Sequence, residues 1–275
     1  MKPVKAAIQL TKLWRNICPD GQIFPVDCRM LAEALNIKVH GEPIDDNFEA
    51  QLRIRGNLRA IIYNENIREE GRKNFCISHE IGHHSCHSDK KEYFCTSKDL
   101  NDMAPHPQNI EQEANLFAAT LLMPVDDFRQ QTRGKTITLS LLSELAESRY
   151  KTSLTATCMR LLELSSSIPI GIAIVRDFKI VRWARTDEMR WSGFGFHKNH
   201  AIPQAVVFHD KSGRPVDSHL WLNEKNANRW DLVQSSVYMP YYDQTLVLIQ
   251  AMRKEVYGDD WEEPDPTPPS IPNFK

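Results

Sequence analysis

The stretch from Phe75 to Asp89, FCISHEIGHHSCHSD, constrains this chain more than any other. It holds four of the ten histidines, two cysteines and two carboxylates within fifteen residues. His79, Glu80 and His83 form an HExxH motif, and in a helix its two histidines project from one face, within reach of one zinc ion. The apolar residues before the motif favour a buried helix, and buried histidines need polar partners. We therefore predict a metal-binding helix here.

Glu80 is offset around this helix from the two histidines. In that geometry it does not bind the metal but lies beside a water that the metal holds, and it can take the proton of that water. The sequence therefore predicts Glu80 as the catalytic base. A structural zinc site built from Cys76, Cys86 and Cys95 is an alternative, but these spacings match no standard site of that kind.

A catalytic zinc needs a third protein ligand. The HExxHxxGxxH arrangement is excluded, because Cys86 and Asp89 stand where its glycine and its last histidine would be. The ligand must come from elsewhere in the chain. The next predicted helix, NIEQEANLFAATLLMP, supplies two carboxylates, Glu111 and Glu113.

Glu111 is favoured as the third ligand because of its position on that helix. Four residues share one helical face at i, i+3, i+4 and i+7, namely Glu111, Ala114, Asn115 and Ala118. The small Ala114 allows a close approach of the two helices. Asn115 would then accept the ring N–H of His79, the kind of support that zinc-bound histidines usually have. Glu113 lies on the other side of the helix and is the fallback ligand.

Composition bounds the class of protein. The chain of 275 residues is long enough for one large domain or two smaller ones, with two favoured. Its content of 41% hydrophobic and 25% charged residues is that of a soluble globular protein, and a net charge of −2 does not indicate a general nucleic-acid binder. The N-terminus lacks an apolar run, so no membrane association is expected. Six cysteines without a CxxC pair suggest reduced thiols and a cytoplasmic protein.

Periodicity predicts an order of elements. Helices are expected over 5–17, 25–37, 66–87, 109–123, 125–132, 138–150 and 153–165. A β-hairpin turns at Gly56-Asn57 between strands 50–55 and 58–63, and a loop covers 89–109. Further strands are expected over 169–177, 179–185, 204–210 and 236–242.

This order predicts an α+β chain in four parts. Residues 1–125 form a lobe with a small mixed sheet, 126–167 a helical subdomain spaced like a helix-turn-helix, and 168–256 a C-terminal mixed, β-rich domain. Residues 257–275 are acidic and proline-rich, and we expect them to be disordered.

The motifs together resemble the ImmA/IrrE family of bacterial metallopeptidases. FCISHEIGHHSCH followed by IEQEANLFAATLLMP is similar to the family pattern HExGHxxxH and ExxANxFAxxLLMP. FPVDCRMLAEALNIKV and RAIIYNENI upstream and LSELAESRYKTSLTATCMRLLEL downstream extend the resemblance to about residues 5–165. It implies a zincin-like metallopeptidase lobe, and a GAF-like sensor is one interpretation of the C-terminal domain.

Carried onto this chain, the resemblance implies one Zn²⁺ per chain, with Mn²⁺ as an alternative metal. His79 and His83 would be ligands, Glu80 the general base and Glu111 the third ligand. His87 matches the last motif histidine, and a supporting hydrogen bond is favoured over ligation for it.

The function expected is that of a zinc-dependent endopeptidase acting on a protein. The resemblance implies a helix-turn-helix transcriptional repressor as the substrate, whose cleavage derepresses stress-response or mobile-element genes. The strand Leu58 to Tyr63 is expected to bind the substrate backbone as an added strand. The alternative is a non-proteolytic transcription regulator that binds DNA or a repressor, with a structural metal site.

Direct DNA binding is the less favoured role of the helical subdomain. Arg149, Lys151 and Arg160 could meet phosphates. Three glutamates in the same segment dilute that charge, Glu144, Glu147 and Glu163. We therefore favour a subdomain that packs on the lobe and helps to bind a protein substrate.

Overall fold

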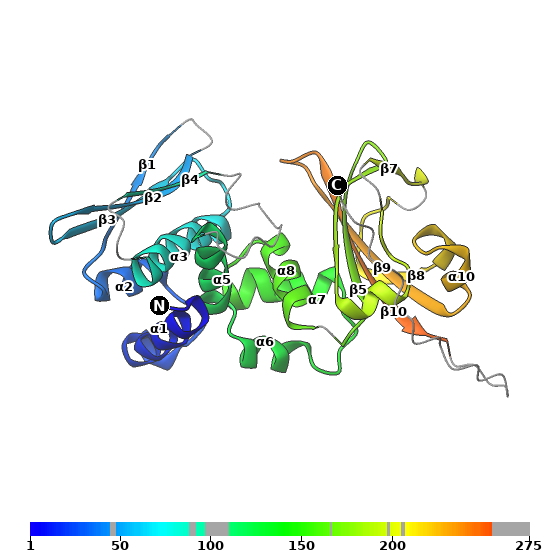
Figure 1. The fold of residues 1–275 in the computed structure, drawn as a ribbon, viewed down its shortest axis with the longest axis horizontal. Coiled ribbons are helices and arrows are strands. Elements are labelled where there is room, and N and C mark those ends of the chain that lie inside the picture. Colours follow the sequence, from blue (N-terminus) through cyan, green and yellow to red (C-terminus); the bar gives the residue numbers. More distant parts are fainter. Residues whose placement is uncertain are drawn as a thin grey trace, which may run out of the picture.

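The computed structural model describes residues 1–44, 48–87, 92–96, 110–165, 167–196, 199–204 and 207–254, with the backbone alone described for 92–96. A sheet lies near each end of the molecule and helices fill the region between them (Figure 1). The first sheet has the strand order β1-β3-β2-β4, and the second has the order β7-β6-β5-β10-β9-β8. The predicted α+β class is confirmed.

The N-terminal helices follow the predicted pattern. α1 (Pro3–Ile17) is amphipathic and buries one stripe that includes Trp14. α2 (Cys28–Ala34) is shorter than predicted, because Asp27 caps it from outside and accepts hydrogen bonds from the N–H groups of Arg29 and Met30. A short 3₁₀ turn, η1 (Pro19–Gly21), lies between the two helices.

The first sheet contains the predicted hairpin. β2 (Phe48–Arg55) and β3 (Leu58–Asn64) pair antiparallel across the turn at Gly56, where φ is +57° and glycine is favoured. β1 (Lys38–Glu42) pairs parallel with β3 on its other side. Because β3 has a paired strand on both sides, the prediction that the substrate backbone binds to it as an added strand is wrong.

The segment predicted as a loop over 89–109 contains a strand. β4 (Glu92–Thr96) pairs antiparallel with β2 and forms an outer strand of the sheet. Its pairing partner lies some forty residues away in the chain, which local patterns do not reveal. The other residues of that predicted loop lie outside the described part of the chain.

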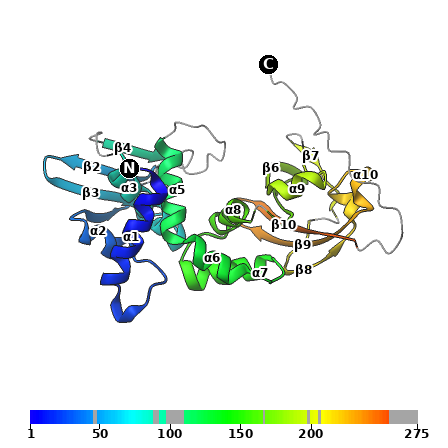
Figure 2. The same cartoon turned by 60° about the horizontal axis from the view of Figure 1, so that its bottom comes forward.

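α3 (Glu70–Cys86) is the central helix of this half. It lies between the first sheet and α1 (Figures 1 and 2). Every residue from Cys76 to His83 is buried, so two turns of the helix are covered on all sides. α5 (Ile110–Leu122) packs against it and ends shortly before Pro124.

The middle of the chain is helical, as predicted. α6 (Val125–Thr132) is followed by α7 (Leu139–Glu144), which continues into a π-helical turn η2 (Leu145–Tyr150). α8 (Leu154–Leu164) follows after three residues, with Ser153 as its N-cap. The helix-turn-helix-like spacing of this segment therefore exists in the fold.

The second sheet is antiparallel throughout its pairings. β5 (Ile170–Arg176) and β6 (Lys179–Arg185) form the predicted hairpin around Asp177 and Phe178. β9 (Trp230–Met239) and β10 (Gln244–Arg253) are the long central pair. The remaining elements are short, namely α9 (Asp187–Trp191), β7 (His200–Ala201), β8 (Asp210–Val216), η4 (Ser218–Leu220) and α10 (Glu224–Ala227).

Two strand predictions in this half are wrong in position. Within 204–210, Val207 lies outside any strand and packs against the core from a loop, and β8 begins at Asp210. The strand predicted over 236–242 begins earlier and stops at Met239, because Pro240 lacks the N–H that a paired strand needs. β8 and β10 were not predicted. Residues 257–275 lie outside the described part.

The second sheet contributes to two hydrophobic cores. Ile172, Val237 and Leu248 on one face belong to the cluster that also contains Ile77, Phe117 and Leu142 of the N-terminal half. Val175, Val247 and Ile249 on the other face pack with Met189, Phe194 and Trp221. The larger core therefore continues across the predicted domain boundary at residue 167. Among the described residues, no helix has the length and apolarity needed to span a membrane.

Candidate metal centre

α3 supplies three motif residues from its fully covered turns. His79, Glu80 and His83 each have no exposed surface. The two histidine rings meet edge to face with their centroids 4.6 Å apart. A four-residue separation on a helix accounts for this, since it places one ring above the other on the same face.

α5 packs closely against α3, because small residues face each other. A Cβ atom on Gly82 would come within 2.9 Å of the Phe117 ring and 3.3 Å of the Ala114 Cα. Gly82, between the two motif histidines, and Ala114, between Glu111 and Asn115, therefore bring the polar faces of the two helices together. The close approach predicted from Ala114 is confirmed, and Gly82 is its counterpart.

Three ligand atoms converge where the helices meet. The Nε2 atoms of His79 and His83 are 3.0 Å apart, and Glu111 Oε2 is 3.1 Å from the first and 3.2 Å from the second. In the part of the chain that the structure describes, these residues form a group whose ligand atoms all lie within 4.8 Å of one another. The favoured triad of ligands is therefore brought together.

The chemistry of this donor set suits a divalent metal. His79 Nδ1 lies 2.9 Å from Asn115 Oδ1, an acceptor, so Nδ1 carries the proton and the Nε2 lone pair faces the other two ligand atoms. Lone pairs of nitrogen and carboxylate oxygen at this separation repel one another without a cation between them. Tetrahedral zinc with bonds of about 2.0–2.1 Å places its ligands roughly 3.3 Å apart, close to the spacing here.

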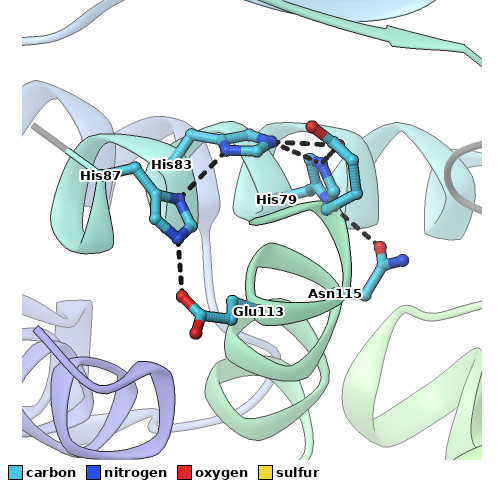
Figure 3. Close-up of polar contacts among 6 residues, drawn as sticks. His79, His83, His87, Glu113 and Asn115 are labelled. Carbon is cyan, nitrogen blue, oxygen red and sulfur yellow. Dashed lines mark hydrogen bonds and ion pairs between the residues drawn. The ribbon is translucent and has the colours of Figure 1, made fainter. Parts of the chain in front are cut away.

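His87 supports His83 from the outer side. Its Nδ1 lies 3.3 Å from His83 Nδ1, and its Nε2 lies 2.7 Å from a carboxylate oxygen of Glu113. Figure 3 shows this chain running from Glu113 through His87 to His83, and His79 meeting Asn115 on the other side. Glu113, predicted as the fallback ligand, therefore contacts a supporting histidine and lies outside the triad.

The ionisation of the ligands matches metal binding. Burial lowers the pKa of His83 to about 4, and the neighbouring His79 adds to this while Glu111 opposes it. Burial alone would raise the pKa of Glu111, but the influence of the adjacent His79 and His83 outweighs it and keeps that pKa far below its usual range. At neutral pH the group thus contains a neutral His83 and an ionised Glu111, the forms that bind a metal.

The other polar residues of the stretch have separate environments. Cys76 is buried and donates a hydrogen bond to Glu49, at 3.2 Å. His84 is half-buried, and burial lowers its pKa. The side chain of Cys95 lies outside the described part, so the three-cysteine alternative stays a prediction.

Comparison with known proteins agrees with this geometry. Residues 32–162 match a peptidase family whose model is described as the IrrE N-terminal-like domain. These residues belong to the ImmA/IrrE family. The matched stretch includes α3, α5 and all three converging ligands, so the domain is of a metallopeptidase type.

Solved structures and curated proteins give two further comparisons. A solved structure described as a Mycobacterium tuberculosis transcriptional regulator superposes with a TM-score of 0.50, covering 90% of this chain and 76% of that one. At 12% sequence identity this similarity shows the fold alone. No curated protein matches the chain in sequence.

The helical segment that ends the ImmA/IrrE match has few cations free to meet DNA. Arg149 makes two hydrogen bonds to Asp127, at 2.7 and 2.5 Å. Arg160 is 2% exposed and bonds to the Met123 carbonyl oxygen and to Glu163. Of the eleven residues of α8, Glu163 is the one that is exposed. A helix covered in this way is poorly placed to enter a DNA groove.

Proposed function

We propose that this protein is a zinc-dependent endopeptidase that cleaves a helix-turn-helix transcriptional repressor. The observation that carries the proposal is the convergence of His79, His83 and Glu111 beside the buried Glu80. Two histidines and one glutamate form a common ligand set of zinc peptidases. A purely structural zinc site would more often have four protein ligands, commonly cysteines.

The chain's own residues would divide the work as follows. Glu80 takes a proton from the attacking water and returns it to the leaving amine. Asn115 and His87 hold the rings of His79 and His83 in orientation. A divalent metal bound to the triad would polarise the scissile carbonyl and make water a stronger nucleophile.

The substrate backbone would add to the first sheet at β4. β3 has partners on both sides, whereas β4 is an outer strand of the sheet among the described residues. An extended segment can pair with such an edge through main-chain hydrogen bonds, which requires little of its sequence. The match to the ImmA/IrrE family supports a transcriptional repressor as the protein that contains this extended segment. Cleavage of the repressor would derepress stress-response or mobile-element genes.

The test is cleavage of a small helix-turn-helix protein encoded beside this chain. Purified Zn²⁺-loaded protein is mixed with that repressor, and fragments are followed by mass spectrometry. Glu80→Gln should bind Zn²⁺ normally and cleave at least about a thousandfold more slowly, because the base is lost. Glu70→Gln, an exposed glutamate on the same helix, is the matched control and should cleave normally.

The same pair of variants tests the alternative of a non-proteolytic regulator. If Glu80→Gln still derepresses the target genes in cells as well as the wild type does, proteolysis is not the mechanism. Fragments of the repressor that appear with the wild type and with Glu70→Gln but not with Glu80→Gln support the peptidase.

A further inference from the structure

A buried charge pair outside the metal triad joins the first sheet to α3. Glu49 of β2 is 8% exposed, and both of its carboxylate oxygens bind Arg72 in the first turns of α3. The Nε–Oε2 and Nη2–Oε1 distances are both 2.6 Å. A guanidinium held at two points has a fixed orientation, so this contact sets how α3 lies on β2.

Cys76 adds a third hydrogen bond to the same carboxylate, one turn further along α3. Its thiol donates to Glu49 Oε2 at 3.2 Å and is 1% exposed. Burial raises the pKa of this thiol, and the charges of Glu49 and Glu80 add to the effect. The thiol therefore stays protonated, and Cys76 serves as a donor rather than as a nucleophile.

Glu80 continues the same row. Arg72, Cys76 and Glu80 are spaced four residues apart, which places them along one side of the helix. Glu80 acts electrostatically on Cys76, so the row is close in space as well as in register. The Glu49–Arg72 ion pair thus fixes the two turns of α3 that precede Glu80, the proposed base.

The Glu49–Arg72 pair also affects the net charge near the metal ligands. Glu49 of β2 and Glu80 of α3 are two buried carboxylates that both act on Cys76, and like charges repel. Arg72 supplies one compensating positive charge at fixed distance. From Arg72 to His79 is seven residues, roughly 10 Å along the helix axis, close enough for an unbalanced buried charge to act on a divalent ion.

Residues of the second sheet also lie near this pair. The turn between β9 and β10 brings Tyr242 close enough for its hydroxyl to feel the charges of Glu69, Arg72 and Glu49. The Arg68 guanidinium lies 5.8 Å from the centre of the Tyr241 ring. The start of α3 is therefore enclosed by residues of both halves of the chain.

We propose that Glu49 and Arg72 are positioning residues of the metal centre, which lock α3 onto β2 and balance the charge beside the metal ligands. The inference rests on the metal centre of the proposed function. An ordinary structural ion pair contributes to stability alone, whereas this pair would also affect how tightly the triad binds its metal. The two partners should affect the metal in opposite directions.

The experiment measures the dissociation constant for Zn²⁺ of the full chain by competition with a chelator. Glu49→Gln removes one negative charge near the metal ligands and should weaken Zn²⁺ binding, whereas Arg72→Gln removes one positive charge and should not. We expect the Glu49→Gln variant to bind Zn²⁺ about tenfold or more weakly than the Arg72→Gln variant. The double variant should lie between the two.

Two controls separate this effect from loss of stability. Asp127→Asn breaks a similar two-point pair with Arg149, between α6 and η2, which carry no ligand of the triad, and should leave the Zn²⁺ affinity unchanged. Cys76→Ala and Cys76→Ser form a milder pair that should fold even where the charge variants do not. Alanine should weaken Zn²⁺ binding several-fold, and serine, which keeps the donor, should restore it.

The outcomes distinguish this inference from the proposed function. Equal Zn²⁺ affinities for Glu49→Gln and Arg72→Gln, or for Cys76→Ala and Cys76→Ser, overturn the positioning role alone. A wild-type chain that binds no Zn²⁺ overturns both. Opposite shifts from the two charge variants support the inference, whether or not Glu80→Gln affects cleavage.

Discussion

Two glutamates on α5 stand two positions apart and have different partners. Glu111 meets both motif histidines, whereas Glu113 meets His87. We expect Glu111→Gln to weaken Zn²⁺ binding by about 100-fold or more, because a charged ligand is lost, and Glu113→Gln by about tenfold or less. Chelator competition with both variants measures this. A larger loss in Glu113→Gln would show that the fallback carboxylate is the true ligand.

This contrast shows how far sequence reasoning reaches for single residues. The spacing of Glu111 and Asn115 along one helical face was enough to predict their contacts with the histidines. The bond between Glu113 and His87 was not predicted, because helical spacing places Glu113 on the other side of α5 from Glu111. The pair of Glu49 and Arg72 was also missed, since no local pattern links residues of a strand and a helix.

Asp127 offers a pH-dependent prediction away from the metal. Burial would raise its pKa, but hydrogen bonds from Arg149 and Tyr150 outweigh this and hold that pKa below its usual value. The folded state then binds fewer protons than the unfolded state near the pKa of a free aspartate, so the stabilisation is present above about pH 4 and is lost as the pH falls below it.

We therefore expect Asp127→Asn to lower the free energy of unfolding by about 1–3 kcal/mol near neutral pH. The difference from the wild type should shrink at a pH below about 4, the ordinary pKa of aspartate. Urea unfolding at both pH values measures it. A difference that stays constant with pH would mean that the carboxylate charge has no part in the stability.

At the scale of elements, the contact of α3 with α5 determines whether a metal site exists. Gly82→Ala places a methyl group against the Phe117 ring and the Ala114 backbone, both of which are buried. We expect it to cost about 1–3 kcal/mol of stability and to weaken Zn²⁺ binding as the helices separate. Denaturant unfolding and chelator competition measure the two effects.

A second substitution provides the control for that prediction. Phe117→Leu removes part of the ring that the new methyl group meets, so adding it to Gly82→Ala should recover part of the Zn²⁺ affinity. If the double variant binds Zn²⁺ no better than Gly82→Ala alone, the helix spacing does not control the site.

Strands were harder to predict than helices for a physical reason. The helices over 5–17 and 125–132 carry their apolar stripe within a dozen residues, and both are found close to the predicted bounds. β4 pairs with a distant strand, and β8 is a polar edge strand that contains Gly213 and Pro215. Neither has the alternation by which a strand is recognised.

At the scale of the whole molecule, the larger core argues that the two halves depend on each other. Leu139, Leu142 and Leu161 share it with Ile172 and Leu248 of the second sheet. We expect a chain of residues 1–165 to expose this apolar face and to unfold at a markedly lower denaturant concentration than the full chain, or to aggregate. Size-exclusion chromatography and urea unfolding measure it.

A domain boundary at residue 167 predicts instead that the N-terminal half folds without the second sheet. If 1–165 unfolds at the same urea concentration as the N-terminal half of the full chain, that half is an independent domain. The domain boundaries stay a prediction until then.

The length of the β9–β10 hairpin determines how far its turn would move if the second sheet tilted. Each strand is ten residues long, so the turn that touches Arg68 stands at the end of an arm of roughly 30 Å. A rotation of about 5° at the base of such an arm moves its tip by about 3 Å, the length of one hydrogen bond. The β9–β10 turn is thus the part of the second sheet that lies beside the start of α3, and a small tilt of that sheet would displace it relative to the Glu49–Arg72 pair.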